Sequence, residues 1–389
     1  MKKEINTLFA LIRCAVLGEQ LSEETKQEAV DKAGLLFKMA RHHDMAHLLD
    51  YAYKIGGISV PDEQTAFELI KYNAMSVMRY ENLNLALVNI SELFEKEEIP
   101  FIPLKGAVIR DFYPEPWMRT SCDIDILVHE EDLERAEKLL IEKLGYISKE
   151  KRGYHDVSLY SDTDVHLELH FNIKENMKNL DGLLSMVWEY ASPKTEGSYE
   201  YVLSNEFFMF QIVSHISYHV LYGGCSLRYF LDLYLLNQKL EFDENVLFSM
   251  LENCGIKTFY DECLRLSTVW FANEKHNETT LLFQEYLLDG GVYGIKKNQI
   301  ALKRKKKGTF SYILERIFMP YEQLVITYPS LKNKRCLTPL YQVRRWFRVV
   351  FNGRIFSSSQ ELTANGEITD QKIDNIACLF EKIGLDKHC

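Results

Sequence analysis

The sequence predicts an α+β fold that is rich in helices, with one small mixed β-sheet between helical regions. Only 19 Gly and 9 Pro occur among the 389 residues, about 7% of the chain, whereas about 12% is usual. A shortage of turn-forming residues favours many helices and short connections. Apolar residues also recur at helical spacing over 1–98 and again over about 203–330, while short strand-like segments lie between these regions.

The composition excludes several classes of protein. Hydrophobic residues make up 47% and charged residues 26% of the chain, which is ordinary for a globular protein and excludes collagen-like or disordered chains. The net charge of −10 disfavours a protein that coats nucleic acid. The best apolar segment, 207–221, contains two histidines and is shorter than the ~20 residues that span a bilayer. The eight scattered cysteines fit reduced thiols, so we expect a cytoplasmic protein.

The first region, 1–98, is predicted to be helical throughout. Leu8, Leu11 and Ile12 share one face at helical spacing. A second helical segment covers roughly 22–55. A third covers 63–97, which has no internal Gly or Pro and carries an acidic face that we interpret as solvated.

The pattern changes at residue 99, where strands begin. The short apolar segment 99–104 is flanked by proline and predicts a strand, and a short helix then follows Lys105 and Gly106. Residues 123–128 alternate between acidic and apolar side chains and predict a second strand. An amphipathic helix over 130–144 ends at Gly145, and 154–160 with 164–171 predict a hairpin. The predicted order is β-α-β-α-β-β.

Helical spacing returns in the C-terminal half, most clearly over 207–221 and 227–240. We expect a loop over 355–370 and a last helix that ends at Lys382. The predicted regions are an N-terminal helical region, a core, a helical domain and a basic extension, over 1–98, 99–175, 176–330 and 331–389.

Two stretches of the C-terminal half concentrate positive charge. Residues 296–307 and 332–354 each contain seven Lys or Arg and no acidic residue. Three interpretations stay open for them: solvated helix faces, a wall that faces phosphates, or a patch for a membrane surface.

A pair of acidic residues lies in the second predicted strand. Side chains two residues apart on a strand point the same way, so Asp123 and Asp125 share one face. In 164–171, Asp164, His166, Glu168 and His170 share a face opposite to four apolar residues. If the two strands are neighbours, Glu168 becomes a third carboxylate, and three such groups suit two divalent cations.

Less specific interpretations apply to the same residues. Alternating acids on an edge strand can simply face solvent. The two histidines with the acids also fit a zinc hydrolase. Lys105 and Gly106 favour a phosphate site instead, because a glycine at a strand-to-helix turn exposes backbone N–H groups.

Together these segments resemble the nucleotidyltransferases of the DNA polymerase beta-like superfamily. More narrowly, they resemble an uncharacterised bacterial nucleotidyltransferase family that is associated with surface-polysaccharide gene clusters. The matching segments are Leu104-Lys105-Gly106, Tyr113-Pro114, Arg119, Asp123-Ile124-Asp125-Ile126-Leu127-Val128, Glu168-Leu169-His170, 227–233, Tyr328-Pro329 and Pro339-Leu340. The wider superfamily often has Gly-Ser where this chain has Lys105-Gly106, as the narrower family does.

The resemblance implies a role for each matching residue. Asp123, Asp125 and Glu168 would bind metal, and Glu168 would also activate the acceptor hydroxyl. Lys105 and Gly106 would hold the triphosphate. Each of three further positions has two possible roles. Arg119 would contact phosphate or support the strand, and His170 would orient Glu168 or the substrate. Arg228 with Asp232 would contact substrate or form a helix pair. His215 and His219 are interpreted as helix-face histidines.

The implied activity is a Mg²⁺-dependent transfer of a nucleoside monophosphate from an NTP to a hydroxyl acceptor, with release of pyrophosphate. Two Mg²⁺ ions are expected, with Mn²⁺ as a substitute, and ATP is the default NTP. The acceptor stays open among a sugar phosphate, a small antibiotic-like molecule, a protein side chain and an RNA end, with nucleic acid not favoured. The alternative is a non-catalytic nucleotide-binding or interaction module on the same fold.

Overall fold

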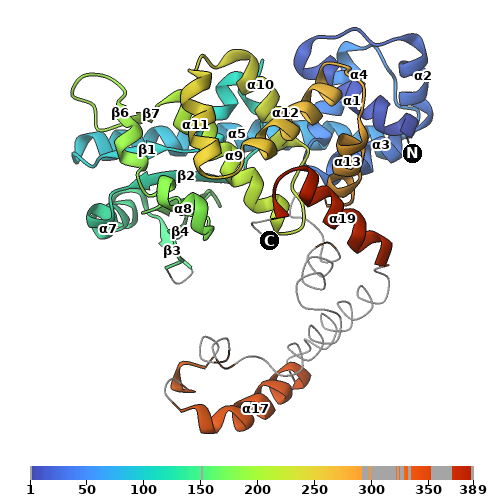
Figure 1. Ribbon diagram of the computed structural model, residues 1–389. Coiled ribbons are helices and arrows are strands. Elements are labelled where there is room, and N and C mark those ends of the chain that lie inside the picture. The colour runs from blue at the N-terminus through green and yellow to red at the C-terminus, as the bar shows by residue number, and fades with distance from the viewer. Residues whose placement is uncertain are drawn as a thin grey trace. The chain divides into compact units, whose positions relative to one another are not determined.

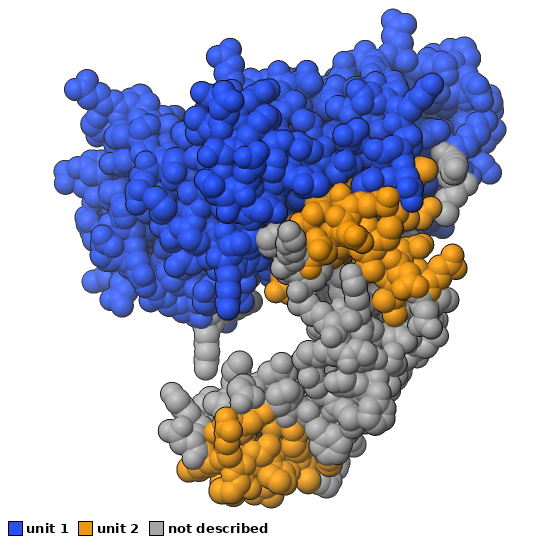
Figure 2. Space-filling model, in the orientation of Figure 1, with its two compact units in different colours: residues 1–218, 226–280 blue, residues 219–225, 281–389 orange. Residues whose placement is uncertain are grey.

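The computed structural model confirms a helix-rich chain with a small mixed sheet (Figure 1). Its described residues are 2–149, 152–290, 298, 321, 324, 328–331, 334–351 and 370–386. They form two compact units, which are coloured separately in Figure 2: residues 1–218 with 226–280, and residues 219–225 with 281–389. Among the described residues, no helix has the length and apolar character needed to cross a membrane.

The N-terminal region is helical, as predicted. Its helices are α1 (Lys2–Leu17), α2 (Glu23–Asp31), α3 (Ala33–His42), α4 (Ala46–Ile55) and α5 (Glu63–Lys96). The Ser22 and Asp62 side chains accept backbone hydrogen bonds at the N-termini of α2 and α5, which satisfies N–H groups that the helices leave unpaired. In Figure 1, α5 runs between the end of the unit that holds α1–α4 and the end that holds the strands.

The sheet has five strands in the order β1-β2-β5-β4-β3. Its strands are β1 (Phe101–Pro103), β2 (Asp123–Val128), β3 (Ile147–Ser148), β4 (Asp156–Tyr160) and β5 (His166–His170). Strands β2 and β5 are parallel, and the other neighbouring pairs are antiparallel. The predicted hairpin is present as β4 and β5. Strand β3 was not predicted, because two exposed residues carry no alternation to detect.

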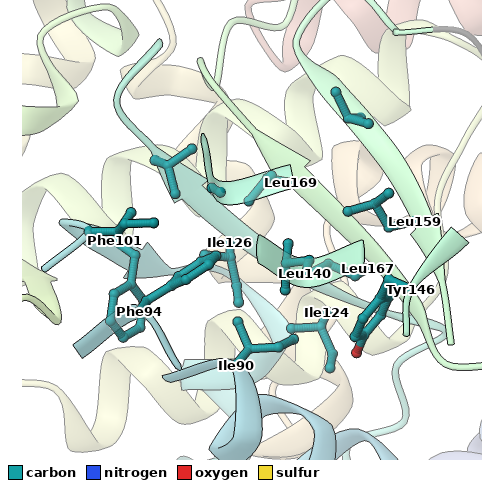
Figure 3. Packing of buried hydrophobic residues seen from close by; sticks show 14 of the residues in the cluster. Ile90, Phe94, Phe101, Ile124, Ile126, Leu140, Tyr146, Leu159, Leu167 and Leu169 are labelled. Atoms are coloured by element: carbon teal, nitrogen blue, oxygen red, sulfur yellow. The ribbon is translucent and has the colours of Figure 1, made fainter. Parts of the chain in front are cut away.

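One face of this sheet forms a hydrophobic core (Figure 3). Ile124 and Ile126 of β2, with Leu167 and Leu169 of β5, are buried there. Helix α5 contributes residues such as Phe94, and helix α7 (Leu133–Leu144) contributes others, so these two helices cover the apolar face. The opposite face of β2 and β5 therefore carries the polar side chains that alternate with these apolar ones.

Short elements connect the strands and lead to the helices that follow. They are α6 (Gly106–Ile109), the 3₁₀ turns η1 (Arg110–Phe112), η2 (Pro116–Met118), η3 (Glu130–Asp132) and η4 (Val187–Tyr190), α8 (Lys178–Leu184), and the strand pair β6 (Ala191–Pro193) and β7 (Tyr201–Leu203). Gly145 has φ = 71° after α7, so the predicted glycine stop is confirmed.

The C-terminal half is mostly helical where the structure describes it. Its elements are α9 (Asn205–Leu221), α10 (Arg228–Lys239), α11 (Glu244–Asn253), α12 (Lys257–Phe271), α13 (Glu278–Gly290), η5 (Pro329–Leu331), η6 (Arg335–Leu337), α17 (Thr338–Phe351) and α19 (Asp370–Lys382). The predicted helices over 207–221 and 227–240 are confirmed, as is the end of the last helix at Lys382. Within the first basic stretch only Asn298 is described, and the second is described over 334–351 apart from some side chains. Of the predicted loop over 355–370, all but the last residue lies outside the described part. The four predicted regions stay a prediction.

Candidate active site

Three carboxylates lie together on the polar face of the sheet. Strand register places Asp125 opposite Glu168 and Asp123 opposite His166 on the parallel pair β2 and β5. Two overlapping groups result, Asp123–His166–Glu168 and Asp125–Glu168–His170, and the potential ligand atoms within each lie within 4.8 Å of one another. Glu168 belongs to both groups, so one side chain links two places where a cation could bind.

His170 balances the charge of two of these acids. Its Nε2 lies 2.8 Å from Asp125 Oδ1 and 3.4 Å from Glu168 Oε2, and the ring is buried. Burial alone would lower the pKa of His170, but the hydrogen bonds to Asp125 and Glu168 outweigh it and raise the pKa to about 9. The imidazolium is therefore the stable form at neutral pH, and it fixes both carboxylates in place.

The pKa values of the two aspartates shift in opposite directions. Burial, with the charges of Asp125 and Glu168, raises the pKa of Asp123. Burial would also raise the pKa of Asp125, but the positive charges of Lys105 and His170 lower it well below its usual range. Of the two aspartates, Asp123 is thus the one whose negative charge is less well balanced by neighbouring positive groups. A nearby cation would stabilise its charged form.

The Lys105–Gly106 turn lies beside these acids. The Leu104 N–H donates to Asp125 O at 3.0 Å, which ties the turn to β2, and Lys105 Nζ lies 3.3 Å from Asp125 Oδ1. Burial lowers the pKa of Lys105, but the charges of Asp125, Glu175 and Glu168 outweigh it and raise the pKa above its usual value. Lys105 also has φ = 42° and ψ = −108°, a strained conformation for a residue other than glycine.

Position 106 requires glycine because the side chains of Arg119 and Ser121 lie very close to its Cα atom. A Cβ atom at this position would lie 2.6 Å from Arg119 Nη1 and 2.9 Å from Ser121 Oγ. Any larger residue would therefore push the turn away from the segment that leads into β2. The Ser121 hydroxyl donates to Asp123 Oδ1 at 3.2 Å, so the same segment also positions the first acid.

Arg119 and Arg228 have partners within the first unit. Arg119 Nη2 lies 3.0 Å from Asp232 Oδ2, and the Tyr113 hydroxyl donates to Asp232 Oδ1 at 2.7 Å. Arg228 Nη1 lies 3.1 Å from Asp44 Oδ2 and donates to Thr120 O at 2.7 Å. Both contacts fasten α10 to the segment before β2, in place of the pairing between Arg228 and Asp232 that the helical spacing offered.

Near the turn, His215, which the sequence presented as a helix-face histidine, contacts Glu175 and Tyr229, two residues to which the sequence assigned no role. His215 Nδ1 of α9 lies 2.7 Å from Glu175 Oε1, and the Tyr229 hydroxyl of α10 lies 3.4 Å from His215 Nε2. The charges of Glu175 and Tyr229 both act on Lys105, so this cluster lies near the turn. Glu175 and His215 are 40 residues apart in the sequence, so no local pattern of residues predicts their contact. His219 belongs to the second unit.

The raised pKa of His170 predicts how stability depends on pH. A histidine whose pKa rises on folding stabilises the folded state at pH values below the pKa that it has in the unfolded chain, near 6.5. This stabilisation is lost as the pH rises through the pKa of the folded state, about 9. We expect the free energy of unfolding of the wild-type protein in EDTA to fall by roughly 3 kcal/mol at most over this range, relative to His170→Gln. Urea titrations at several pH values measure it. The partly exposed His129→Gln serves as the control and should follow the wild type, whereas equal pH profiles for His170→Gln and wild type would contradict the assignment.

Acids from two parallel strands lie beside a lysine–glycine turn, and their side chains could hold a metal ion. A family model described as "Uncharacterised nucleotidyltransferase" matches residues 31–272. The chain belongs to this uncharacterised nucleotidyltransferase family, and it is therefore placed among transferases. No curated protein matches the chain.

Proposed function

We propose that the protein transfers a nucleoside monophosphate from an NTP to a hydroxyl acceptor, in a Mg²⁺-dependent reaction on a polymerase beta-like core. One observation carries this proposal: Asp123, Asp125 and Glu168 lie in register on β2 and β5, next to the Lys105–Gly106 turn. Membership of a nucleotidyltransferase family supports the same reaction.

The donor atoms at the site fit a divalent cation. Asp123, Asp125 and Glu168 offer carboxylate oxygens, the ligands that Mg²⁺ prefers, and the raised pKa of Asp123 reflects carboxylate repulsion that a cation would relieve. These three residues would hold the two Mg²⁺ ions of the proposal, and Mn²⁺ would be a substitute. Bound Mg²⁺ supplies charge neutralisation at the phosphates and at the reacting oxygens.

The residues then have separate roles in the reaction. Lys105 and the backbone of Gly106 bind the triphosphate, because a positive charge and backbone N–H groups at the start of a helix suit an anion. Glu168 takes the proton of the acceptor hydroxyl. The acceptor oxygen forms a bond to the α-phosphorus, and the bond from that phosphorus to the bridging oxygen breaks, so pyrophosphate leaves.

The neighbouring side chains position these groups. His170 orients Glu168 and Asp125 through its two short contacts. Arg119 and Arg228, whose guanidinium groups contact Asp232 and Thr120, hold the segment that precedes the acids. ATP is our default NTP, and the acceptor belongs to surface-polysaccharide metabolism in this proposal, with a sugar phosphate as the first compound to test.

A turnover assay tests the proposed function. We expect purified protein to release pyrophosphate from at least one NTP with Mg²⁺ and a suitable acceptor from a panel of sugars, sugar phosphates, peptides and RNA ends. EDTA should abolish this release, and added Mg²⁺ or Mn²⁺ should restore it. NTP binding without pyrophosphate release across the panel would favour a non-catalytic module, and stoichiometric bound zinc would favour a hydrolase.

A further inference from the structure

A small hollow lined by arginines lies behind the Lys105–Gly106 turn. Its polar lining comes from α5, from η1 and from the segment before β2, and includes Ser76, Arg79, Arg110, Arg119, Thr120 and Ser121. No acidic residue lines it. Three arginines therefore line one place inside the first unit, and a buried positive charge is costly unless a negative charge balances it.

Only one of these arginines has a carboxylate partner. Arg119 is paired with Asp232. Arg79 forms no ion pair or hydrogen bond with any side chain or backbone group of the described residues. Arg79 therefore brings to the wall of the hollow a positive charge that no described carboxylate pairs with.

Arg110, like Arg79, has no carboxylate partner among the described residues, and it is buried, with only 4% of its surface exposed. Its Nε donates to Gly106 O at 3.0 Å, and its guanidinium carbon lies 5.6 Å from the centre of the Tyr80 ring. Its Nη1 is buried and has no hydrogen-bond partner among the described residues. Burial and the charge of Arg119 lower the pKa of Arg110, and the opposing charges of Tyr80 and Asp111 do not offset this effect.

The space in the hollow selects the kind of anion. It has room for about one water-sized sphere. A chloride ion is a single sphere, so it needs far less space than phosphate or sulfate, which carry four oxygens around a central atom. The donors are N–H groups with fixed directions, which suit a compact anion placed between them.

We propose that this hollow binds one monatomic anion, with chloride as its representative, held by the guanidinium groups of Arg110 and Arg79. The anion supplies the acceptor that Arg110 Nη1 needs. It also steadies the turn, because Arg110 Nε holds the carbonyl of Gly106 and Arg119 lies directly beside the Gly106 Cα. The site is separate from the carboxylates and binds its ion whether or not a nucleotide is present.

Thermal unfolding in different potassium salts at equal ionic strength tests the site. We expect the melting temperature of the wild-type protein to rise by about 2 °C from gluconate to chloride or bromide, at roughly tenfold excess over the dissociation constant. Arg110→Gln should lose this rise. If Arg110→Gln does not fold, Arg79→Gln at the partly exposed wall takes its place. The control Arg135→Gln, at an exposed residue bonded to a backbone carbonyl, should keep the full rise.

Anomalous diffraction from crystals grown in bromide tests the position without any variant. We expect a bromide peak between Arg79 and Arg110. A melting temperature that is independent of halide, together with no peak in the hollow, would overturn the proposal. Phosphate or sulfate stabilises proteins in general, so only the difference between wild type and Arg110→Gln counts. If the melting temperatures of wild type and Arg110→Gln differed more in phosphate than in chloride, that result would also overturn the proposal, in favour of an oxyanion site.

Discussion

Replacing both Asp123 and Asp125 by asparagine is expected to reduce metal-dependent pyrophosphate release by roughly 1,000-fold or more. Asparagine keeps the shape of each side chain and removes both negative charges, so the cation loses most of its attraction to β2. Lys105 and His170 would then face neutral amides in place of the Asp125 carboxylate that they now contact. Pyrophosphate release at saturating NTP and Mg²⁺ measures the effect.

The matched control is Asp162→Asn, which removes one charge from an exposed turn residue between β4 and β5. It should keep wild-type turnover. Circular dichroism of the double variant separates lost chemistry from lost folding. Undiminished turnover in a folded double variant would exclude the proposed role of the two aspartates.

Asp232→Asn is expected to destabilise the protein by about 3–5 kcal/mol, because it leaves the Arg119 guanidinium buried without a counterion. Arg119 is 6% exposed and Asp232 is fully buried, and Tyr113 donates to the same carboxylate. Denaturant unfolding followed by circular dichroism measures this loss. The double variant Arg119→Gln with Asp232→Asn should lose less than the sum of the two single variants, since neither charge is then left alone.

The control for this pair lies on the surface. Lys138 and Glu142 of α7 form an exposed contact of 3.9 Å, and Glu142→Gln should change stability by less than about 0.5 kcal/mol. A similarly small loss for Asp232→Asn would show that α10 does not depend on this ion pair for its attachment to the segment before β2.

Local periodicity predicted much of the fold. The alternation over 123–128 and 164–171 predicted two strands with one apolar and one acidic face, and both strands are present with Ile124 and Leu167 in the core. The glycine after α7 marked its end. The strands β3, β6 and β7 were missed because they have two or three residues each, too few for a period of two to be visible.

The sequence likewise predicted one part of the candidate site and not the other. Asp123, Asp125 and Glu168 were recognisable because side chains at alternate positions of a strand point the same way, whatever surrounds the strand. Their electrostatic environment was not recognisable. The pairing of Asp125 with both Lys105 and His170 depends on how three separate segments pack, and so does the contact between Glu175 and His215.

The sequence by itself determined the helix-rich α+β class, the strands β2 and β5 and the acidic face of β2, because each follows from the local order of polar and apolar residues. The tertiary structure alone decided the partners of the charged residues. It placed Asp232 against Arg119, Asp44 against Arg228, and Arg110 in a hollow without a carboxylate. The reason is that a buried charge is stabilised by atoms from distant parts of the chain, and only packing brings those atoms within reach.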